Sequence, residues 1–257
     1  MIKGKKGIIF GIANDHSIAW GIAKKLKENG AELGITYQNE VILKRVKPLA
    51  SELNSELLIK CDFSNTQDID KCFKEVSNKW NSIDFAIHSV AYSNKNELSG
   101  RYVNTSKENF LNTLNISCFS FTKIAYLFSP LMKNGGSFLT LTFHGSKKVM
   151  PSYNVMGVAK AALETSVKYL SNDLGSKKIR VNAISAGPMR TLAGAAISNA
   201  REVYKYTEEN SSLKRNVSLD ELGNTALYFV SDLSKAVTGE IHYVDCGFNI
   251  KGMPKNN

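Results

Sequence analysis

Residues 6–30 read KGIIFGIANDHSIAWGIAKKLKENG, and this stretch decides how the rest of the chain is interpreted. It opens with a short apolar run that Gly11 ends, which predicts a buried β-strand. Apolar residues then recur every four positions from Ile18 to Leu26 and mark one face of an α-helix, which Gly30 ends. A strand, a short turn and a helix in this order are typical of the unit from which parallel α/β sheets are built.

Short apolar runs and longer amphipathic stretches alternate almost to the end of the chain. Runs such as LLI, FAI and FLTL are continuous, which is typical of strands buried on both faces of a parallel sheet. Strands are expected at residues 6–10, 33–37, 57–61, 85–89, 137–142, 180–184 and 241–244. Beyond the first helix, helices are expected near residues 40–53, 66–80, 106–128, 153–175 and 219–232.

This order predicts a single α/β domain over residues 1–257, with a Rossmann-like, doubly wound parallel sheet of about seven strands and helices on both faces. No linker, repeat or low-complexity segment interrupts it. Residues 185–216 are long, partly helical and follow a strand. Because open α/β sheets bind ligands beyond the carboxyl ends of their strands, we expect the part near residues 190–216 to cover a substrate.

Composition narrows the classes of partner. The 257 residues are 43% hydrophobic and 22% charged, which is typical of a globular chain able to bury one large core. The formal net charge of +10 admits nucleic acid, a membrane surface or an acidic carrier protein as partners. The lysines are spread over the whole length and no recognition motif is present, so a Lys-rich surface is favoured over nucleic-acid binding.

The lack of a recognisable targeting signal and the spacing of the cysteines lead us to expect a cytoplasmic protein. The N-terminus lacks a signal peptide, and no apolar stretch approaches the ~18 residues that a membrane helix requires, so no membrane partner is expected. The cysteines form no CxxC pair, which argues against a disulfide framework and against a metal site. We expect four reduced, mostly buried thiols, at Cys61, Cys72, Cys118 and Cys246.

The turn after the first strand has features of a phosphate-binding turn. Gly11 and the small Ala13 permit a tight turn and a close approach of the backbone to a pyrophosphate, which would meet the N-terminus of the next helix. Ser17 is a good N-cap for that helix, and its hydroxyl could alternatively meet phosphate. An ordinary strand-to-helix loop with a capped helix is the alternative interpretation.

Residues that follow the second strand indicate which dinucleotide binds. An acidic residue there usually binds the ribose 2′-OH of NAD, whereas Arg or Lys accommodates the 2′-phosphate of NADP. Residues 37–40 read YQNE and no basic residue follows until Lys44, which favours NADH. Asp62 and Phe63, after the third strand, offer a carboxylate and an aromatic ring to an adenine, although ordinary surface-loop chemistry explains them nearly as well.

Tyr153 and Lys160 lie seven residues apart, after the fifth strand. Seven residues make nearly two helical turns, so both side chains are expected on one helix face, where they could straddle one cofactor. A nearby ammonium favours the ionised phenol and lowers its pKa. Tyr153 could then donate a strong hydrogen bond to a developing negative charge.

Taken together, these motifs resemble the NADH-dependent enoyl-(acyl-carrier-protein) reductases, a divergent branch of the short-chain dehydrogenases. The nucleotide turn alone is a weak signal, but the Tyr-x6-Lys pair combined with AISAGP-x-RTLA is specific. The resemblance extends over essentially the whole chain. The matching stretches are GIAN at 11–14, SIAWGIA at 17–23, YQN at 37–39, His88-Ser89, PSYNVMG at 151–157 with Ala159-Lys160, VNAISAGP at 181–188, RTLA at 190–193 and TGE at 238–240.

The resemblance implies reduction of the trans-2 double bond of an enoyl thioester by NADH, in bacterial type II fatty-acid synthesis. It implies that Tyr153 donates its hydroxyl to the thioester carbonyl, and that Lys160 holds the nicotinamide ribose and keeps Tyr153 acidic. For the cofactor it implies contacts with Gly11, Ala13, Ser17, Ile18, Gln38, Asp62, Phe63, Ser89, Val90, Ala91, Lys160, Ala186, Pro188, Met189 and Thr191. For the substrate it implies contacts with Ala91, Tyr153, Met156, Ala193, Ile197 and Tyr204.

Two further implications concern partners. The family's carrier protein is acidic, and a basic rim at the pocket mouth would speed the encounter. Candidates for that rim are Arg201, Lys205, Lys214 and Arg215, among which Glu202, Glu208 and Glu209 dilute the charge. The resemblance also implies a homotetramer.

The chain departs from the family at Phe143, where a second tyrosine usually stands ten residues before Tyr153. The ring is kept and the hydroxyl is lost; His144 could replace it as a donor, although a lone loop histidine is more often exposed. Two alternatives stay open: an NAD-binding paralogue with weakened catalysis, and a dehydrogenase of simple carbonyl compounds. Cys246 stands where a second glycine is expected, and the sequence suggests no function for it.

Overall fold

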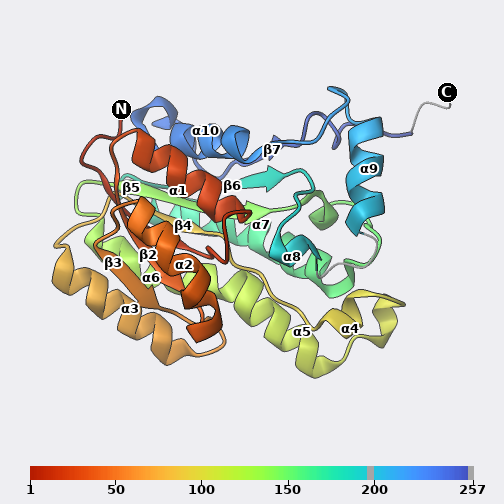
Figure 1. Cartoon of the computed structure of the whole chain (residues 1–257), viewed down its shortest axis with the longest axis horizontal. Coiled ribbons are helices and arrows are strands. Elements are labelled where there is room, and N and C mark those ends of the chain that lie inside the picture. Colours follow the sequence, from red (N-terminus) through yellow and green to blue (C-terminus); the bar gives the residue numbers. More distant parts are fainter. Residues whose placement is uncertain (196–199, 254–257) are drawn as a thin grey trace.

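The computed structural model of the chain describes residues 1–195 and 200–253. Its centre is a seven-stranded parallel sheet in the order β3-β2-β1-β4-β5-β6-β7 (Figure 1). The expected fold class and the seven expected strands are confirmed, and β6 differs most because it runs two residues past the expected end at 184. The strands are β1 (Lys6–Phe10), β2 (Glu32–Tyr37), β3 (Leu57–Lys60), β4 (Phe85–His88), β5 (Gly136–Thr142), β6 (Ile179–Ala186) and β7 (Ile241–Val244).

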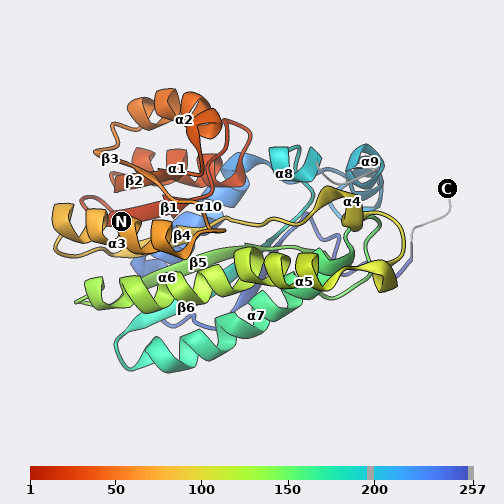
Figure 2. The ribbon, with the colours of Figure 1, turned by 90° about the horizontal axis from the view of Figure 1, so that it is seen from below.

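Helices cover both faces of the sheet, with α1, α2 and α10 on one face and α3, α6 and α7 on the other (Figure 2). Among the described residues, no helix has the length and apolar character needed to cross a membrane. The helices are α1 (Ile18–Glu28), α2 (Glu40–Glu52), α3 (Thr66–Lys79), α4 (Lys95–Leu98), α5 (Lys107–Leu114), α6 (Ser120–Phe128), α7 (Asn154–Gly175), α8 (Leu192–Ala195), α9 (Ala200–Asn210) and α10 (Leu219–Val230).

Both faces of β1 are buried, which explains its continuous apolar run. Ile8 and Phe10 pack into the core that includes side chains of α3, α6 and α7. Ile9 packs into the core on the opposite face, with side chains of α1, α2 and α10. A strand with only one buried face would alternate apolar and polar residues instead.

The strand order reverses direction at β1, which pairs with β2 on one side and with β4 on the other. Ligands of doubly wound sheets bind at this point, beyond the carboxyl ends of the strands. Gly11 follows β1 with a φ of 102°, and a Cβ there would overlap the carbonyl group of Ser89, which follows β4. Glycine is therefore required at this position both by its backbone conformation and by the neighbouring backbone.

The single helix expected over residues 106–128 is interrupted. A π-helical turn at Asn115–Phe119 separates α5 from α6. Within it, the hydroxyl of Ser117 accepts a hydrogen bond from the backbone N–H of Tyr92 (2.9 Å) and donates one to the carbonyl of Tyr92 (3.0 Å). The loop after β4 is thereby joined to the π-helical turn. The helical periodicity of the sequence does not predict this tertiary contact.

The stretch 185–216 begins inside β6, and the segment expected to cover a substrate, near residues 190–216, starts beyond that strand. Ser185 and Ala186 belong to β6, and Ser185 pairs in register with Thr142 of β5. The two helices α8 and α9 follow, beyond the carboxyl ends of the strands (Figure 1). The prediction of a partly helical segment at this edge of the sheet is confirmed for its described residues.

Replacing Gly11 with Ala tests the contact between the β1 and β4 ends. We expect Gly11→Ala to lower the free energy of unfolding by about 3 kcal/mol, because strain at positive φ adds to a clash with backbone. Gly4→Ala is the matched control: Gly4 also has a positive φ (75°), but a Cβ there meets nothing within 4 Å. The control should lose only about 1 kcal/mol in urea unfolding. Equal losses in the two variants would show that the contact with Ser89 contributes nothing.

Candidate active site

The turn between β1 and α1 is organised around the hydroxyl of Ser17. This oxygen accepts hydrogen bonds from the backbone N–H groups of Ala13 (3.0 Å) and Asn14 (3.1 Å). Ser17 stands at the N-cap position of α1, but its side chain makes no hydrogen bond to the helix, so the predicted capping bond is wrong. Because the hydroxyl folds back into the turn, it leaves the first N–H groups of α1 available to an anion at the helix N-terminus.

The residues expected to bind an adenosine lie at the ends of β2 and β3. The side-chain amide of Gln38 donates a hydrogen bond to the carboxylate of Asp62 (3.4 Å), so the structure brings this pair together. Phe63 is instead buried, with its ring edge-on to those of Phe10 (5.6 Å) and His88 (5.9 Å). The Phe63 ring therefore packs in the core.

Three of the expected cofactor contacts, Ser89, Val90 and Ala91, directly follow β4. The backbone N–H of Ser89 donates to the carbonyl of Phe10 (3.0 Å), which continues the pairing of the two strands at the switch point. Val90 packs against the core and Ala91 is exposed. This short segment lies beside the phosphate-binding turn at the carboxyl edge of the sheet.

Tyr153 is held in a strained turn just before α7. It occupies the N-cap position of the helix, so it precedes the helix that was expected to contain it. Its neighbours Ser152 (φ 54°) and Asn154 (φ 33°) both have left-handed backbone conformations, which are unfavourable for residues other than glycine. Such strain persists only where surrounding contacts compensate for it.

The side chain of Asn154 supplies compensating contacts. Its amide nitrogen donates to three backbone carbonyls in the segment that contains α4, those of Glu97 (3.1 Å), Ser99 (3.4 Å) and Gly100 (3.4 Å). These bonds join the start of α7 to the chain that follows β4. The backbone beside Tyr153 is thus anchored from outside its own turn.

The ring of Tyr153 is buried between two other parts of the β5–α7 connection. It lies edge-on to the ring of Phe143, with 5.1 Å between centroids. It also covers Gly145, where a Cβ would lie 2.5 Å from the Tyr153 ring. The aromatic ring at position 143 therefore has a packing role that does not need a hydroxyl.

Lys160 is buried nearly two helical turns further along α7, and its ammonium donates to the carbonyl of Leu141 in β5 (2.8 Å). Burial lowers the pKa of Lys160 to about 8, because the charged form is penalised away from water. Burial also raises the pKa of Tyr153 far above its ordinary value, and the nearby carboxylate of Glu164 raises it further. The pKa of Tyr153 was expected to fall beside Lys160, but burial and Glu164 raise it instead.

His144 is buried, so the expectation of an exposed loop histidine is wrong. Its ring packs against the aromatic rings of Phe248 (5.9 Å between centroids) and Tyr243 (6.3 Å). Burial lowers the pKa of His144, with a smaller contribution from Lys148. Its closest described aromatic neighbours thus belong to β7 and the residues after it, which favours a packing role over replacement of the missing hydroxyl.

The segment after β6 lies across the phosphate-binding turn. A pocket of about 320 Å³ is lined by His16 of that turn together with Met189, Arg190 and Tyr204. The guanidinium of Arg190 lies 4.4 Å from the ring centroid of Tyr204, a cation–π contact that joins the residues before α8 to α9. Two of the expected contact residues, Met189 and Tyr204, thus meet at one cavity.

The remaining expected site residues lie near this edge. Ala186 is the last residue of β6 and is buried. The side-chain oxygen of Thr191 accepts from the backbone N–H of Gly194 (2.9 Å) at the start of α8. Met156 packs with Tyr153 in a small apolar cluster. Ala193 belongs to α8 but its side chain lies outside the described part, as does all of Ile197.

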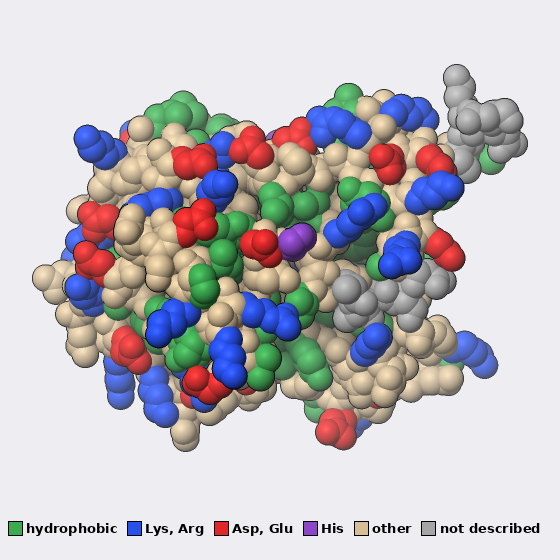
Figure 3. Space-filling model, in the orientation of Figure 1, with side chains coloured by type: hydrophobic (Ala, Val, Ile, Leu, Met, Phe, Trp, Pro, Cys, Tyr) green, Lys and Arg blue, Asp and Glu red, His purple; other side chains and the backbone are tan. Residues whose placement is uncertain are grey.

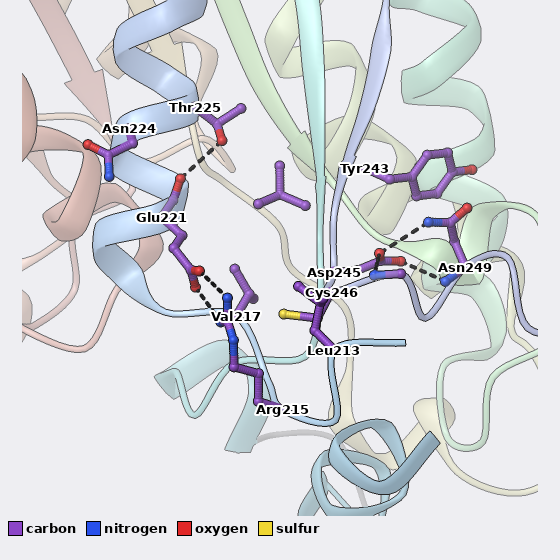
Figure 4. Close-up of a pocket in the computed structure, with 12 residues that line it drawn as sticks. Leu213, Arg215, Val217, Glu221, Asn224, Thr225, Tyr243, Asp245, Cys246 and Asn249 are labelled. Atoms are coloured by element: carbon purple, nitrogen blue, oxygen red, sulfur yellow. Dashed lines mark hydrogen bonds and ion pairs between the residues drawn. The ribbon is translucent and has the colours of Figure 1, made fainter. Parts of the chain in front are cut away.

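A second pocket, of about 390 Å³, lies between α10, β7 and residues 213–217 (Figure 4). None of the expected cofactor or substrate residues lines it. Arg215 and Glu221 face each other across its rim in a two-point ion pair, at 2.9 and 2.6 Å. Cys246 lines the pocket with a φ of 57°, which explains the expectation of glycine there, since that conformation favours a residue without a Cβ.

Sequence reasoning missed three residues of the site. Gly145 is revealed by its close approach to the Tyr153 ring, and Asn154 by its hydrogen bonds to a segment more than fifty residues away in the chain. Glu164, 1% exposed, had a readable signal: a carboxylate one turn beyond Lys160, on a helix face that is otherwise buried. A charged residue on such a face is rare unless it is paired.

Comparisons with known proteins agree with this geometry. A family model described as enoyl-(acyl carrier protein) reductase matches residues 11–249. The chain is 56% identical to the NADH-dependent enoyl-(acyl-carrier-protein) reductase 2 of Rhizobium meliloti, over 99% of this chain and 95% of that protein. The crystal structure of FabI from Candidatus Liberibacter asiaticus matches with a TM-score of 0.97 and 55% identity, covering 99% of this chain and 98% of that one.

A second solved structure, the enoyl-(acyl-carrier-protein) reductase of Anaplasma phagocytophilum in complex with NAD, matches with a TM-score of 0.96 and 54% identity. The match covers 99% of this chain and 97% of the Anaplasma chain. The resemblance predicted from the sequence motifs is confirmed, and the chain belongs to the enoyl-(acyl-carrier-protein) reductase family.

Proposed function

We propose that this chain reduces the trans-2 double bond of an enoyl thioester carried by acyl carrier protein, with NADH as reductant and with Tyr153 and Lys160 as catalytic residues. The observation that carries this assignment is the burial of the Tyr153 phenol and the Lys160 amine together at the carboxyl edge of the sheet. Membership of the enoyl-(acyl-carrier-protein) reductase family supports the reaction and the cofactor.

The residues at the switch point fit a dinucleotide. The position of Gly11 brings the backbone of the first turn against the β4 end, where a side chain would block it. The N-terminus of α1 favours a pyrophosphate, while Gln38 and Asp62 offer polar groups to an adenosine. No basic side chain precedes Lys44 after β2, which favours NADH over NADPH. When bound, NADH supplies the hydride.

Tyr153 stabilises the charge that appears during the reduction. Addition of hydride to the β-carbon places negative charge on the thioester oxygen, and a hydrogen bond from a positioned phenol lowers the energy of that enolate. A phenol whose pKa is raised keeps its proton at neutral pH, so it is available as the donor. Packing against Phe143 and Gly145 fixes its direction beforehand.

Lys160 acts beside it as a fixed positive charge. Its hydrogen bond to Leu141 holds the ammonium against β5. With a pKa of about 8 the amine is charged at neutral pH and loses its charge as the pH rises through that value. We therefore expect activity to fall on the alkaline side.

An exposed apolar face supports the proposal of a homotetramer. Helices α5, α6 and α7 lie together on one side of the sheet (Figure 2). Three large side chains of the α5–α6 segment and one of α7 are more than half exposed. Large apolar side chains exposed on neighbouring helices are typical of a surface that pairs with another copy. The residues are Leu111 (56%), Phe119 (51%), Tyr126 (74%) and Tyr169 (72%).

The cytoplasm is our proposal for the location of the protein. All four cysteines carry free thiols, and three of them are buried. Free thiols are typical of proteins kept in a reducing compartment.

Removing the phenol hydroxyl tests the catalytic assignment. We expect Tyr153→Phe to lower kcat for a trans-2-enoyl thioester by about 10²–10³-fold, the usual cost of losing a donor that faces developing charge. NADH absorbance measures the rate, and NADH binding by fluorescence titration should stay within a few-fold of the parent. The control Tyr243→Phe should keep at least half of the parental kcat. Parental turnover by Tyr153→Phe would refute the role of this hydroxyl.

Restoring a hydroxyl at position 143 tests whether its loss weakens catalysis. We expect Phe143→Tyr to raise kcat by less than about 10-fold. A donor that faces the developing charge changes kcat by about 10²–10³-fold, and Tyr153 already supplies that donor. Phe143→Leu, which removes the ring that packs against Tyr153, should lower kcat instead. A gain of 100-fold or more in Phe143→Tyr would instead identify this chain as a weakened paralogue.

Removing two basic residues of α9 tests docking of the carrier protein. Figure 3 shows Lys and Arg side chains over the region of α8 and α9, interspersed with acidic ones. We expect Arg201→Ala with Lys205→Ala to raise KM for a carrier-bound enoyl substrate about 3–10-fold at low salt, without changing KM for the same acyl group on a small thiol. Lys24→Ala with Lys71→Ala is the charge-matched control. Equal KM values in parent and variant would exclude this docking surface.

A further inference from the structure

Glu164 is a buried carboxylate that the proposed reaction does not use. It lies on α7 one turn beyond Lys160 and is 1% exposed. Burying a charge is unfavourable unless close partners compensate, and apolar residues of similar volume often give equal or greater stability. A buried glutamate this close to the catalytic residues therefore needs an explanation beyond packing.

Its partners come from the last residue of β5 and from the turn between β5 and α7. The hydroxyl of Thr142, the last residue of β5, donates to Glu164 Oε1 (2.8 Å). The hydroxyl of Ser146 donates to the same oxygen. The ammonium of Lys147 lies 3.1 Å from Glu164 Oε2. Two hydroxyl donors on one oxygen and an ion pair on the other are the pattern that suits a carboxylate.

These bonds hold the turn on which Tyr153 rests. The 3₁₀ turn at His144–Ser146 contains Gly145, whose Cα lies directly under the Tyr153 ring. The carbonyl of Gly145 in turn approaches α7 so closely that a Cβ on Gly157 would lie 2.8 Å from it. A shift of this turn would therefore displace the phenol, because no side chain separates them.

The charge of Glu164 also acts on both catalytic groups. Burial lowers the pKa of Lys160 to about 8, while Cys118 and Glu164 act in the opposite direction. Burial raises the pKa of Tyr153, and Glu164 adds to that effect. The carboxylate thus favours the protonated form of both the ammonium and the phenol, the forms that the reaction requires.

We propose that Glu164 is a positioning residue of this enzyme, which fixes the turn that seats Tyr153 and provides the counter-charge that keeps Lys160 an ammonium. The inference rests on the proposed function, since it assumes that Tyr153 and Lys160 act on the substrate. It predicts a change in the pH dependence of the reaction, which a purely structural role would leave unaltered.

Several titratable groups from neighbouring elements share this environment. Lys147 is half exposed, whereas His144 has a pKa lowered by burial and is neutral in the alkaline range. The groups that face Glu164 or Lys160 are Lys147 and His144 from the turn before α7, Tyr243 from β7, Tyr153 beside α7, Cys118 from the π turn and His88 from β4.

Glu164→Gln keeps the size of the side chain and an acceptor oxygen but removes the charge. Without the carboxylate, the pKa values of Lys160 and Tyr153 both fall. The loss of activity on the alkaline side should therefore begin at a lower pH than in the parent. We expect the alkaline limb of kcat/KM for an enoyl thioester to move down by about one pH unit, the usual effect of one close charge. Glu164→Asp, which keeps the charge on a shorter side chain, should retain the parental limb at a reduced kcat.

Lys147→Met gives an independent test with the opposite sign. Lys147 is the charged partner of Glu164, so its removal leaves the carboxylate less neutralised and raises the pKa of Lys160. The alkaline limb should then move to higher pH by about half a unit. Because the Lys147 side chain is 50% exposed, this variant should fold even if Glu164→Gln does not. Glu52→Gln, an exposed change on α2, controls for the loss of one negative charge.

The outcomes separate this inference from the proposed function. Opposite shifts in Glu164→Gln and Lys147→Met, with Glu52→Gln unshifted, support it. If the alkaline limb of kcat/KM in Lys147→Met and in folded Glu164→Gln is the same as in the parent, the positioning role of Glu164 is overturned. This holds even when Tyr153→Phe loses activity as proposed. Full activity of Tyr153→Phe would overturn the catalytic assignment itself, and this inference with it.

Discussion

Removal of ionisable side chains from water is the constraint on which the active edge of this protein depends. Tyr153, Lys160 and Glu164 are each buried where α7 packs against the ends of β5 and β6. In that environment a phenol keeps its proton, an ammonium becomes easier to deprotonate, and a carboxylate must find donors. Lys160 donates a hydrogen bond to Leu141, and Glu164 accepts hydrogen bonds from Thr142 and Ser146. These partners belong to β5 and to the turn that follows it.

Strand positions could be predicted from the sequence because both faces of each central strand are buried. Ile8, Ile9 and Phe10 form a continuous apolar run for that reason, and the same pattern located the other strands. The switch point and the residues at its edge followed from strand order. The spacing of Tyr153 and Lys160 located the pair, and the structure buries both at one end of the sheet.

The predictions that failed depended on contacts that local patterns do not encode. Ser17 looked like a helix cap, but two N–H groups of its own turn compete for its hydroxyl. The π turn depends on a bond between Ser117 and the loop at Tyr92. The pKa of Tyr153 was expected to fall because a charge was considered without its burial. His144 was expected at the surface because its aromatic neighbours, Tyr243 and Phe248, come from the far end of the chain.

The three carbonyl bonds of Asn154 have a mechanical consequence. They make residues 97–100 and the turn that presents Tyr153 a single connected body, even though over fifty residues separate them in the chain. A bulky molecule that pushes the α4 segment outward must either rupture those bonds or drag Asn154 along. Crowding on that side is thereby converted into misalignment of the phenol, so an inhibitor could act without touching the tyrosine at all.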